Sequence, residues 1–361
     1  MKLFYITRVN IPSNAAQSVQ IRSMCIAFSS LIDEFKLIST HNDENKELEK
    51  NFLWDKIKLN SKFNYLEFAI KSFLKVRKEN PTHIFTRDIV VAFVISFLNI
   101  KVSYEAHKEP KTKTANFIIK HLKTKQNFFL ITISKALKDY YLAEYNYDNK
   151  KVLDCHDAVF FEKYDKYRDI TKSKLREELN LPLEKLIVMH TGSLYKGNDA
   201  KLFKVIVDNF KEILFVQVGG SESDIRKYQI YYKNNNNILF IAHQKHDSIV
   251  KYQMSADLLF YSLTKENELW WCTSPLKLFE YLATGIPVLG SNIGSISEIL
   301  DENNSILFNP EEEQSIVDGV NIFLNKKSAV QRKALQAKMD AQEKHTWQKR
   351  AGKILEFIGG G

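Results

Sequence analysis

The sequence has little of what covalent or metal cross-linking would require. Only three cysteines occur among 361 residues, Cys25, Cys155 and Cys272, and no two of them form a CxxC pair. Such wide spacing argues against a disulfide framework or a thiolate zinc site, and it is typical of a protein from a reducing compartment. Internal repeats and long low-complexity segments are also absent, which argues against a solenoid or fibrous architecture.

Long hydrophobic runs are missing as well. The longest uncharged apolar stretch is Ile89–Ile100, which is well short of the roughly 20 residues that a membrane-spanning helix needs. We interpret it as a buried helix. The N-terminal sequence MKLFYITRVN is too short and too polar for a signal peptide. These absences predict a cytoplasmic protein.

What is present is typical of a globular protein with a basic surface. The chain is 44% hydrophobic and 26% charged, and its net charge is +9, at a length that suits about two domains. Lys71, Lys75, Arg77 and Lys78 gather on a predicted helix, Tyr65–Lys78. Residues 101–125 hold seven lysines and two glutamates. These clusters are either a solvated surface or an attraction for anionic lipid headgroups at the plasma membrane or for a polyanionic acceptor.

Nucleic acid is not expected as a partner, because no RNA- or DNA-binding motif accompanies the charge.

Short apolar runs alternate with amphipathic stretches along the chain, which predicts two open, mostly parallel α/β sheets. The predicted strands of the first half are Leu3–Thr7, Phe35–Ser39, His83–Thr86, Val102–Glu105 and Phe129–Ile133. Those of the second half are Leu186–Thr191, Leu214–Val218, Ile238–Ile241, Leu258–Tyr261 and Pro287–Gly290. We predict one Rossmann-like domain over residues 1–165 and another over 166–340, with a last helix at 341–358.

The strongest chemical signal is the segment that runs from Ser274 to Gly285. Ser274 suits an N-cap and Pro275 a first helical position, and Gly285 is placed to end the helix. The N-terminus of a helix binds phosphate readily. Lys277 is unfavourable for the helix dipole there, which suggests an anion nearby, and Glu280 can accept hydrogen bonds from vicinal sugar hydroxyls. The alternative is an ordinary amphipathic helix with a surface lysine and glutamate.

Two further loops follow predicted strands, where ligands bind in open α/β sheets. Residues 190–197, HTGSLYKG, combine glycines with Lys196, and residues 218–221 contain a glycine pair. Both suit close approach to a phosphate, although either could equally be a turn without a ligand. His243 and His246 have helical spacing, but no third metal ligand accompanies them.

Taken in order, these segments resemble the retaining glycosyltransferases of the GT-B fold, family four (glycosyl transferases group 1). The matching segments are SPLKLFEYLATGIPVLGSNIGSISEIL (274–300), HTGSLYKGND (190–199), ILFIAHQKHDSIVKYQMSADLLFYS (238–262), HTWQKRAGKILEFI (345–358), FTRD (85–88), YEAH (104–107) and ITISKALKDYY (131–141). The resemblance implies an N-terminal acceptor-binding domain, a C-terminal nucleotide-sugar-binding domain that faces it across a cleft, and a last helix that crosses back to the first domain.

The resemblance also implies a donor site. The residues that it places there are Gly192, Ser193, Lys196, Gly219, Ala242, His243, Ser274, Pro275, Leu276, Lys277 and Glu280. Lys196 would contact the diphosphate, Glu280 would bind the ribose, and Ala242 and His243 would lie beside the base. The donor would be a UDP-sugar in preference to a GDP-sugar, with no further cofactor.

In the first domain, the resemblance implies that His107 faces the reacting sugar. His107, Lys196 and Glu280 would then form the catalytic set. The loop Asn10–Ser18 would replace a glycine-rich acceptor loop, with Asn14, Ala15, Gln17 and Ser18 along the acceptor. The acceptor would be a saccharide or a lipid-linked saccharide used in bacterial surface glycan synthesis.

The sequence departs from the family at three places. Cys272 stands where the family commonly has a glutamate, Ser193 stands where it has an arginine, and the N-terminal loop contains no glycine. These departures keep two alternatives open, a catalytically impaired nucleotide-sugar-binding partner and a GT-B nucleotide-sugar epimerase. Because no Asp-x-Asp motif occurs, we expect the diphosphate to be bound without a metal. Retention of configuration is implied by the resemblance alone.

Overall fold

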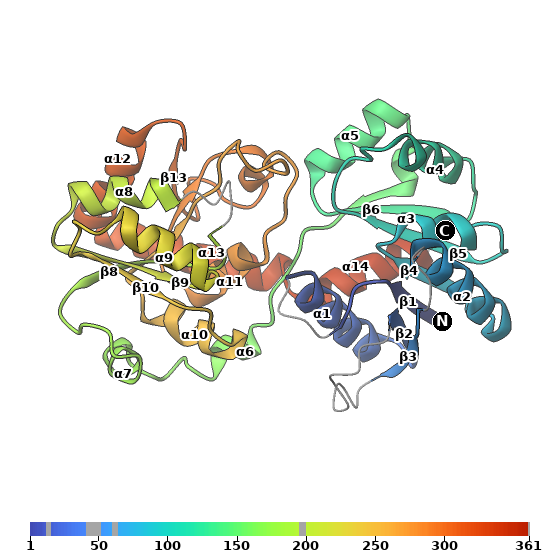
Figure 1. The fold of residues 1–361 in the computed structure, drawn as a ribbon, viewed down its shortest axis with the longest axis horizontal. Coiled ribbons are helices and arrows are strands. Elements are labelled where there is room, and N and C mark those ends of the chain that lie inside the picture. Colours follow the sequence, from blue (N-terminus) through green and yellow to red (C-terminus); the bar gives the residue numbers. More distant parts are fainter. Residues whose placement is uncertain (12–15, 41–51, 60–63, 195–199, 360–361) are drawn as a thin grey trace. The chain divides into compact units, whose positions relative to one another are not determined.

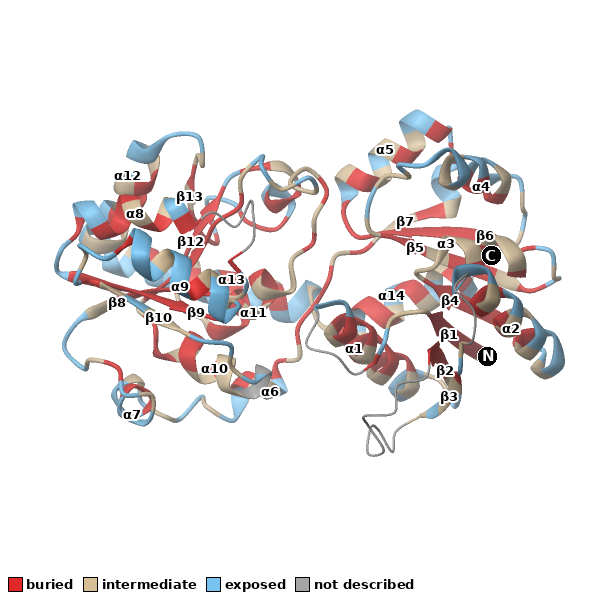
Figure 2. Cartoon of the chain, in the orientation of Figure 1, coloured by how far each residue is buried: buried red, intermediate tan, exposed pale blue. Residues whose placement is uncertain are grey.

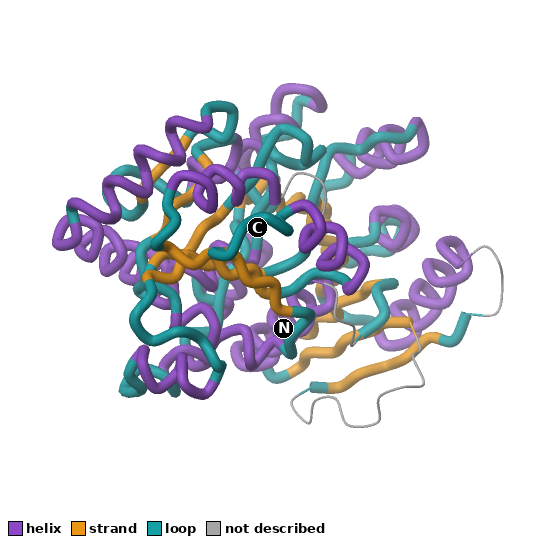
Figure 3. The backbone as a smooth tube through the Cα atoms, turned by 60° about the vertical axis from the view of Figure 1, so that its left-hand side comes forward, coloured by secondary structure: helices purple, strands orange, loops and turns teal. Residues whose placement is uncertain are grey.

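The computed structural model describes residues 1–11, 16–40, 52–59, 64–194 and 200–359 (Figure 1). The chain forms two compact units. The first comprises Met1–Asp157 together with Trp347–Gly361, and the second comprises Ala158–Thr346. In each unit a layer of strands lies among helices, as the tube in Figure 3 shows.

The first unit contains a seven-stranded parallel sheet with the order β3-β2-β1-β4-β5-β6-β7. Its strands are β1 (Lys2–Thr7), β2 (Glu34–Thr40), β3 (Leu53–Ile57), β4 (His83–Thr86), β5 (Lys101–Ala106), β6 (Phe128–Thr132) and β7 (Val152–Asp154). Its helices are α1 (Ala16–Leu31), α2 (Asn64–Glu79), α3 (Ile89–Ile95), α4 (Lys113–Lys123), α5 (Lys135–Tyr145), the short η1 (Asn149–Lys151) and α14 (Trp347–Gly359).

The strand order of the first unit assigns its helices to two faces. Crossovers between parallel strands are right-handed, and α1 connects β1 to β2 in one direction along the sheet, whereas α2, α3 and α4 connect strands in the other. Helix α1 therefore lies on the opposite face from α2, α3 and α4. Helix α14 packs against α1, while α3 packs against both α2 and α4.

The second unit contains a six-stranded parallel sheet with the order β10-β9-β8-β11-β12-β13. Its strands are β8 (Leu186–Thr191), β9 (Ile213–Val218), β10 (Ile238–Ile241), β11 (Leu258–Tyr261), β12 (Val288–Ser291) and β13 (Ile306–Phe308). Its helices are α6 (Glu162–Asp165), α7 (Lys172–Glu178), α8 (Ala200–Asn209), α9 (Glu222–Tyr231), α10 (His246–Ser255), α11 (Leu276–Thr284), η2 (Gly294–Glu298), α12 (Glu313–Asn325) and α13 (Lys327–Lys344).

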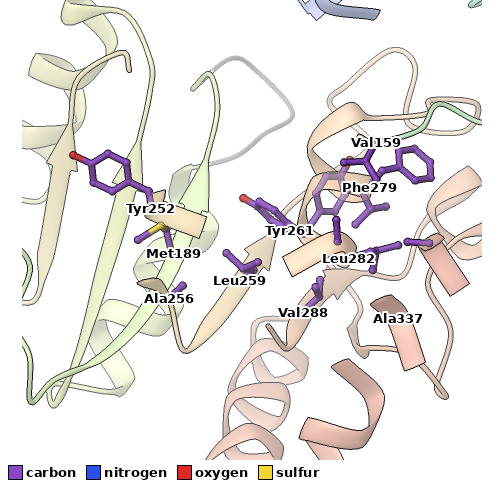
Figure 4. Packing of buried hydrophobic residues seen from close by; sticks show 14 of the residues in the cluster. Val159, Met189, Tyr252, Ala256, Leu259, Tyr261, Phe279, Leu282, Val288 and Ala337 are labelled. Carbon is purple, nitrogen blue, oxygen red and sulfur yellow. The ribbon is translucent and has the colours of Figure 1, made fainter. Parts of the chain in front are cut away.

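Apolar side chains from the strands and from α11 form one core of the second unit (Figure 4). Within this core, Met189 of β8 lies beside Tyr252 and Ala256, and Val288 of β12 lies beside Leu282 of α11. Strands β9, β11 and β12 are buried along their whole length (Figure 2). A sheet with helices on both faces has no solvated side, so its strands are continuously apolar instead of alternating.

The prediction of two doubly wound parallel sheets is confirmed, and the strands at residues 186–191, 238–241 and 258–261 have the expected bounds. Three short or edge strands, β3, β7 and β13, were not predicted. Ile89–Ile100 does form a helix, but it ends at Ile95. Among the described residues, no helix is both long and apolar enough to cross a bilayer.

The structure divides the chain after Asp157, not at the predicted residue 165. The reason is packing, because Val159, Phe161 and Tyr164 belong to the core of the second unit. The last helix also differs from the predicted 341–358. Helix α13 continues to Lys344, and the helical chain is interrupted where the Val159 amide donates to the His345 carbonyl at 2.9 Å.

Candidate functional site

Polar residues and glycines of the second unit converge at the carboxyl ends of β8, β9 and β10. The order of the sheet reverses between β8 and β11, and ligands of open α/β sheets bind at such a switch point. Helix α11 begins beside this edge, at Leu276. Pro275 is its N-cap residue, and no side chain caps the helix. The prediction of Ser274 as N-cap is therefore wrong. The predicted end is correct, since Gly285 has a φ of 72°.

Two glycines bring the loops after β8 and β9 into direct contact. Gly192 and Gly219 have φ values of +117° and +106°. Residues other than glycine rarely adopt this backbone conformation. The Gly192 amide donates to the Val218 carbonyl at 2.8 Å. A Cβ atom added to Gly219 would lie 2.8 Å from the Gly192 carbonyl oxygen. The two loops therefore pack tightly against each other. Because neither glycine carries a side chain, a bound anion could approach their backbone closely.

Replacing Gly219 by alanine is expected to destabilise the protein and to weaken the binding of any ligand that contacts these two loops. The positive φ costs about 1–3 kcal/mol for a residue with a side chain, and the contact with the Gly192 carbonyl oxygen adds to that cost. Urea unfolding provides the measurement. Gly352→Ala is the control, because nothing lies within 4 Å of the added Cβ in helix α14, and that change should stabilise by about 0.5–1 kcal/mol. Equal effects of the two changes would contradict the prediction.

A buried glutamine fixes the carbonyls of these loops. The amide nitrogen of Gln217 donates to the carbonyls of Gly192 and Gly219, at 2.8 and 3.1 Å. Its carbonyl oxygen lies 2.6 Å from Nδ1 of His190. Because both N–H groups of the amide are used, the oxygen must accept, and Nδ1 of His190 must carry the proton.

This assignment leaves Nε2 of His190 as an acceptor. It lies 2.8 Å from Nζ of Lys277, so the ammonium donates to the ring. His190 is fully buried, and burial together with the neighbouring Lys277 lowers its pKa well below the usual range. The histidine is therefore neutral, and it orients the lysine.

Lys277 carries its charge at the carboxyl edge of the sheet. Its Nζ lies 3.4 Å from the position of a Cβ on Gly192 and 5.6 Å from the centre of the Tyr261 ring. Burial lowers the pKa of Lys277 to about 7, and the charge of Glu280 only partly opposes this. An ammonium held in this environment gains from the arrival of an anion, because an opposite charge favours the protonated form.

A second hydrogen-bond network orients Glu280, one turn further along α11. The Gln253 carbonyl oxygen accepts from the hydroxyl of Tyr164 at 2.9 Å. Its amide nitrogen therefore faces Thr191 Oγ1 and Glu280 Oε2, each at 3.2 Å. The Thr191 amide in turn donates to the hydroxyl of Tyr281 at 2.7 Å. Glu280 is thus fixed as an acceptor, with further lone pairs available to a ligand.

The other predicted donor-site residues have varied surroundings. Ala242 and His243 are exposed just after β10, and Ser193 is exposed after Gly192. Ser274 is buried, and Pro275 and Leu276 are half-buried at the start of α11. Cys272 is completely buried, so its thiol does not take the place of a solvent-facing carboxylate. Glu266 and Glu268 lie exposed in the same loop.

The structure describes only some of the remaining predicted residues. Lys196, Asn14 and Ala15 lie outside the described residues. Gln17 and Ser18 belong to helix α1 of the first unit, where Gln17 is exposed and Ser18 is buried. Among the described residues, no group of three or more His, Cys, Asp and Glu side chains could hold a metal ion.

His107 of the first unit follows β5 and belongs to a buried cluster of charges. Its Nε2 lies 2.9 Å from Oε2 of Glu105, and Oε1 of Glu105 accepts from Arg350 at 2.6 Å. Arg87 lies 3.5 Å from the same carboxylate. The Arg350 guanidinium, together with His107 and Arg87, holds the pKa of Glu105 well below its usual range despite its burial. Burial and the charge of Arg87 lower the pKa of His107 to about 4. His107 is therefore neutral at pH 7 and donates from Nε2.

The same cluster binds helix α14 to the sheet of the first unit. Arg350 of α14 donates to the carbonyls of Cys155 and His156, at 3.2 and 2.8 Å. Asp157 accepts from Gln20, and burial raises the pKa of Asp157 to about 6. Both chain segments that connect the units, near residues 157 and 347, are thereby fixed within the first unit.

Comparison with known families gives this geometry a context. Residues 171–344 match the model of a family described as glycosyl transferases group 1. This segment is similar to that family. It contains the loops after β8, β9 and β10 and all of α11. A search of curated proteins found no match.

Solved glycosyltransferase structures share the fold of the entire chain. A glycosyltransferase from Rickettsia africae is 17% identical, with a TM-score of 0.82 and coverage of 99% of this chain and 98% of that one. HepE of Anabaena in complex with UDP is 16% identical, with a TM-score of 0.80 and full coverage of both chains. Sucrose-phosphate synthase from Thermosynechococcus elongatus is 14% identical, with a TM-score of 0.77 and coverage of 100% and 99%. The chain therefore has the GT-B fold of two Rossmann-like domains.

Several polar residues of the two units were not singled out from the sequence. They are Glu105, Thr191, Gln217, Gln253, Tyr281 and Arg350. The available signal was a polar residue inside an otherwise apolar element, such as Gln217 in ILFVQV of β9. Buried polar groups are nearly always hydrogen-bonded, so each such residue indicates a partner that sequence order does not reveal.

Proposed function

We propose that the protein transfers a sugar from a nucleotide-sugar to a saccharide or lipid-linked acceptor. One observation carries the proposal. The Lys277 ammonium lies in the first turn of α11, beside a neutral His190 and above the bare backbone of Gly192. Backbone amides of a helix N-terminus and a half-buried lysine together suit a diphosphate.

The remaining groups suggest how a donor lies. Glu280, oriented by Gln253 at 3.2 Å, would accept hydrogen bonds from the ribose hydroxyls. Ala242 and His243, exposed after β10, would lie beside the base. HepE, whose fold the chain shares, is solved in complex with UDP-glucose, and we infer a UDP-sugar as donor. The second unit, Ala158–Thr346, would then be the nucleotide-sugar domain, and the first unit would be the acceptor domain.

For the mechanism we infer retention without a metal. Breaking the glycosidic bond leaves negative charge on the diphosphate, which Lys277 and the N-terminus of α11 would stabilise. Lys196 would add a further charge. The acceptor hydroxyl would attack from the face that the leaving phosphate occupies, and a phosphate oxygen would accept its proton. His107, neutral and held by Glu105 at 2.9 Å, would bind a donor-sugar hydroxyl through Nδ1 and would not act as a nucleophile.

A donor screen tests the proposal. Purified protein is incubated with UDP- and GDP-sugars, with and without a lipid-linked saccharide, in the presence of EDTA, and release of the nucleoside diphosphate is measured. Transfer should require the acceptor, and the anomeric configuration of the product, read by NMR, should match that of the donor. Donor consumption with no acceptor requirement would favour an epimerase. Tight UDP binding with no turnover of any donor would favour an inactive binding partner.

The affinity for UDP should fall as the pH rises above 7. In the free protein Lys277 loses its proton with a pKa of about 7, whereas a bound diphosphate raises that pKa. UDP itself changes little there, since a terminal phosphate loses its last proton near pH 6. Because binding then requires the uptake of one proton by Lys277, the affinity for UDP falls by up to about tenfold for each unit of pH above 7. Isothermal titration between pH 6.5 and 9 measures this. The Lys277→Met variant should bind UDP weakly, with an affinity that does not change with pH. If its affinity fell with pH as steeply as that of the native protein, Lys277 would be excluded as the titrating group.

A further inference from the structure

Helix α2 of the first unit presents apolar side chains to solvent. Leu66, Ile70 and Leu74 follow one another at intervals of four residues, and their exposed fractions are 55%, 47% and 57%. The side that packs on the sheet carries different residues, namely Phe68, Ala69, Ser72 and Val76. The helix is therefore apolar on two sides, and packing within the unit covers only one of them.

Aromatic residues continue this surface over α3 and α4. Phe97, just after α3, is 60% exposed, and Phe117 of α4 is 63% exposed. Both rings pack around His121, with centroid distances of 5.4 and 6.5 Å. They are therefore held in place at the surface.

These side chains come from neighbouring helical segments, because α3 packs against both α2 and α4. The exposed turns of α2 and α4 are visible in Figure 2. We call Leu66, Ile70, Leu74, Phe97 and Phe117 the outer apolar face. Monomeric proteins rarely leave so many large apolar side chains together in water unless they bind something.

Positive charge surrounds the outer apolar face. Helix α4 has no acidic residue, and its Lys113, Lys120 and Lys123 are all exposed. The ammonium of Lys125 lies 4.9 Å from the centre of the Phe97 ring. On α2, Lys71 and Lys75 follow Ile70 and Leu74 in the sequence. Each of these lysines also contacts a carboxylate, Glu67 and Asp55 respectively.

We propose that the outer apolar face binds the surface of an anionic lipid bilayer. The side chains of the outer apolar face would enter the boundary between headgroups and acyl chains, as the apolar side of an interfacial helix does. The α4 lysines would extend to the lipid phosphates, and each would add to the attraction for an anionic surface. The charge complementarity favours lipid over a protein partner, because α4 offers three exposed cations and no carboxylate. This inference does not depend on the proposed function, since it concerns the first unit without its substrates.

Vesicle co-sedimentation of the full chain tests the proposal. Vesicles of phosphatidylglycerol and phosphatidylcholine are compared with phosphatidylcholine alone, at low and high salt, without nucleotide. Two variants remove the apolar and the basic part of the face, namely Phe97→Ser with Phe117→Ser, and Lys113→Glu with Lys120→Glu and Lys123→Glu. Two matched controls alter exposed residues of the second unit, namely Ile230→Ser with Tyr231→Ser, and Lys227→Glu with Lys326→Glu and Lys327→Glu.

The native chain should bind the anionic vesicles, and high salt should weaken binding. Each face variant should lower the partition coefficient by at least about tenfold, while both controls keep the native value. Thermal melting and UDP affinity, which report on the rest of the chain, should be unchanged in the face variants. Three results would overturn the proposal. These are no binding of the native chain at low salt, equal losses in face variants and controls, and dimerisation of the native chain that the Phe97 and Phe117 changes abolish.

Discussion

Replacing Lys277 by methionine is expected to lower kcat/KM for the nucleotide-sugar by about 100- to 1,000-fold, the usual cost of removing one group that stabilises charge in a transition state. Among the described residues, the Lys277 ammonium lies at the first turn of α11, beside Gly192 and the ring of His190. Methionine keeps the length of the side chain and removes only the charge. The loss should appear in kcat as well as in KM, because negative charge on the leaving diphosphate grows as the bond breaks.

Steady-state kinetics with saturating acceptor measures this loss. Lys227→Met is a control at an exposed position of the same unit, and it should keep native kinetics. His190→Leu should reproduce part of the defect, because it removes the acceptor that orients Lys277 at 2.8 Å. A Lys277→Met enzyme with native kcat and KM would show that the diphosphate lies elsewhere.

Replacing Arg350 by methionine is expected to lower the free energy of unfolding by about 3–5 kcal/mol, the range for breaking a buried ion pair. Arg350 is 2% exposed, and its partner Glu105 is 1% exposed. The carboxylate would lose its 2.6 Å contact and stay buried, with only Arg87 and His107 near it. The loss should be larger than for most single changes.

Urea unfolding followed by circular dichroism measures the effect. Lys353→Met, on the same helix, removes a hydrogen bond from an exposed side chain to the Asp154 carbonyl, and it should cost under about 1 kcal/mol. Adding Glu105→Gln to Arg350→Met should recover much of the loss, because the buried side chain at position 105 then carries no charge. If the double variant were no more stable than the Arg350 single variant, packing of α14 and not the charge pair would be the cause.

The two networks of the second unit have a common physical basis. Each uses a buried glutamine whose amide group is completely occupied, Gln217 beneath the glycine loops and Gln253 beneath Glu280. An occupied amide cannot rotate without losing buried hydrogen bonds, which is costly in a low-dielectric interior. The side chains proposed to meet the donor are therefore positioned before any ligand arrives. Preorganisation of this kind reduces the entropic cost of binding.

Local sequence determined the elements of the protein. Continuous apolar runs such as Leu258–Tyr261 are buried on both faces of a sheet, so they were recognisable as parallel strands. Gly285 ended α11 as predicted, because its φ of 72° suits a residue without a side chain. Short strands such as β13, Ile306–Phe308, were missed because three residues carry too little pattern. Ser274 was misplaced as an N-cap because the backbone turns into the helix one residue later.

Only the tertiary structure decided which polar groups meet. Lys277 and His190 are 87 positions apart, and Arg350 and Glu105 are 245 apart. No periodicity encodes such distances, since they follow from the order of strands in a sheet and from the return of α14 to the first unit. The sequence alone could therefore propose a phosphate site at the start of α11. It could not reveal that a neutral histidine orients its lysine, because that depends on which nitrogen Gln217 contacts.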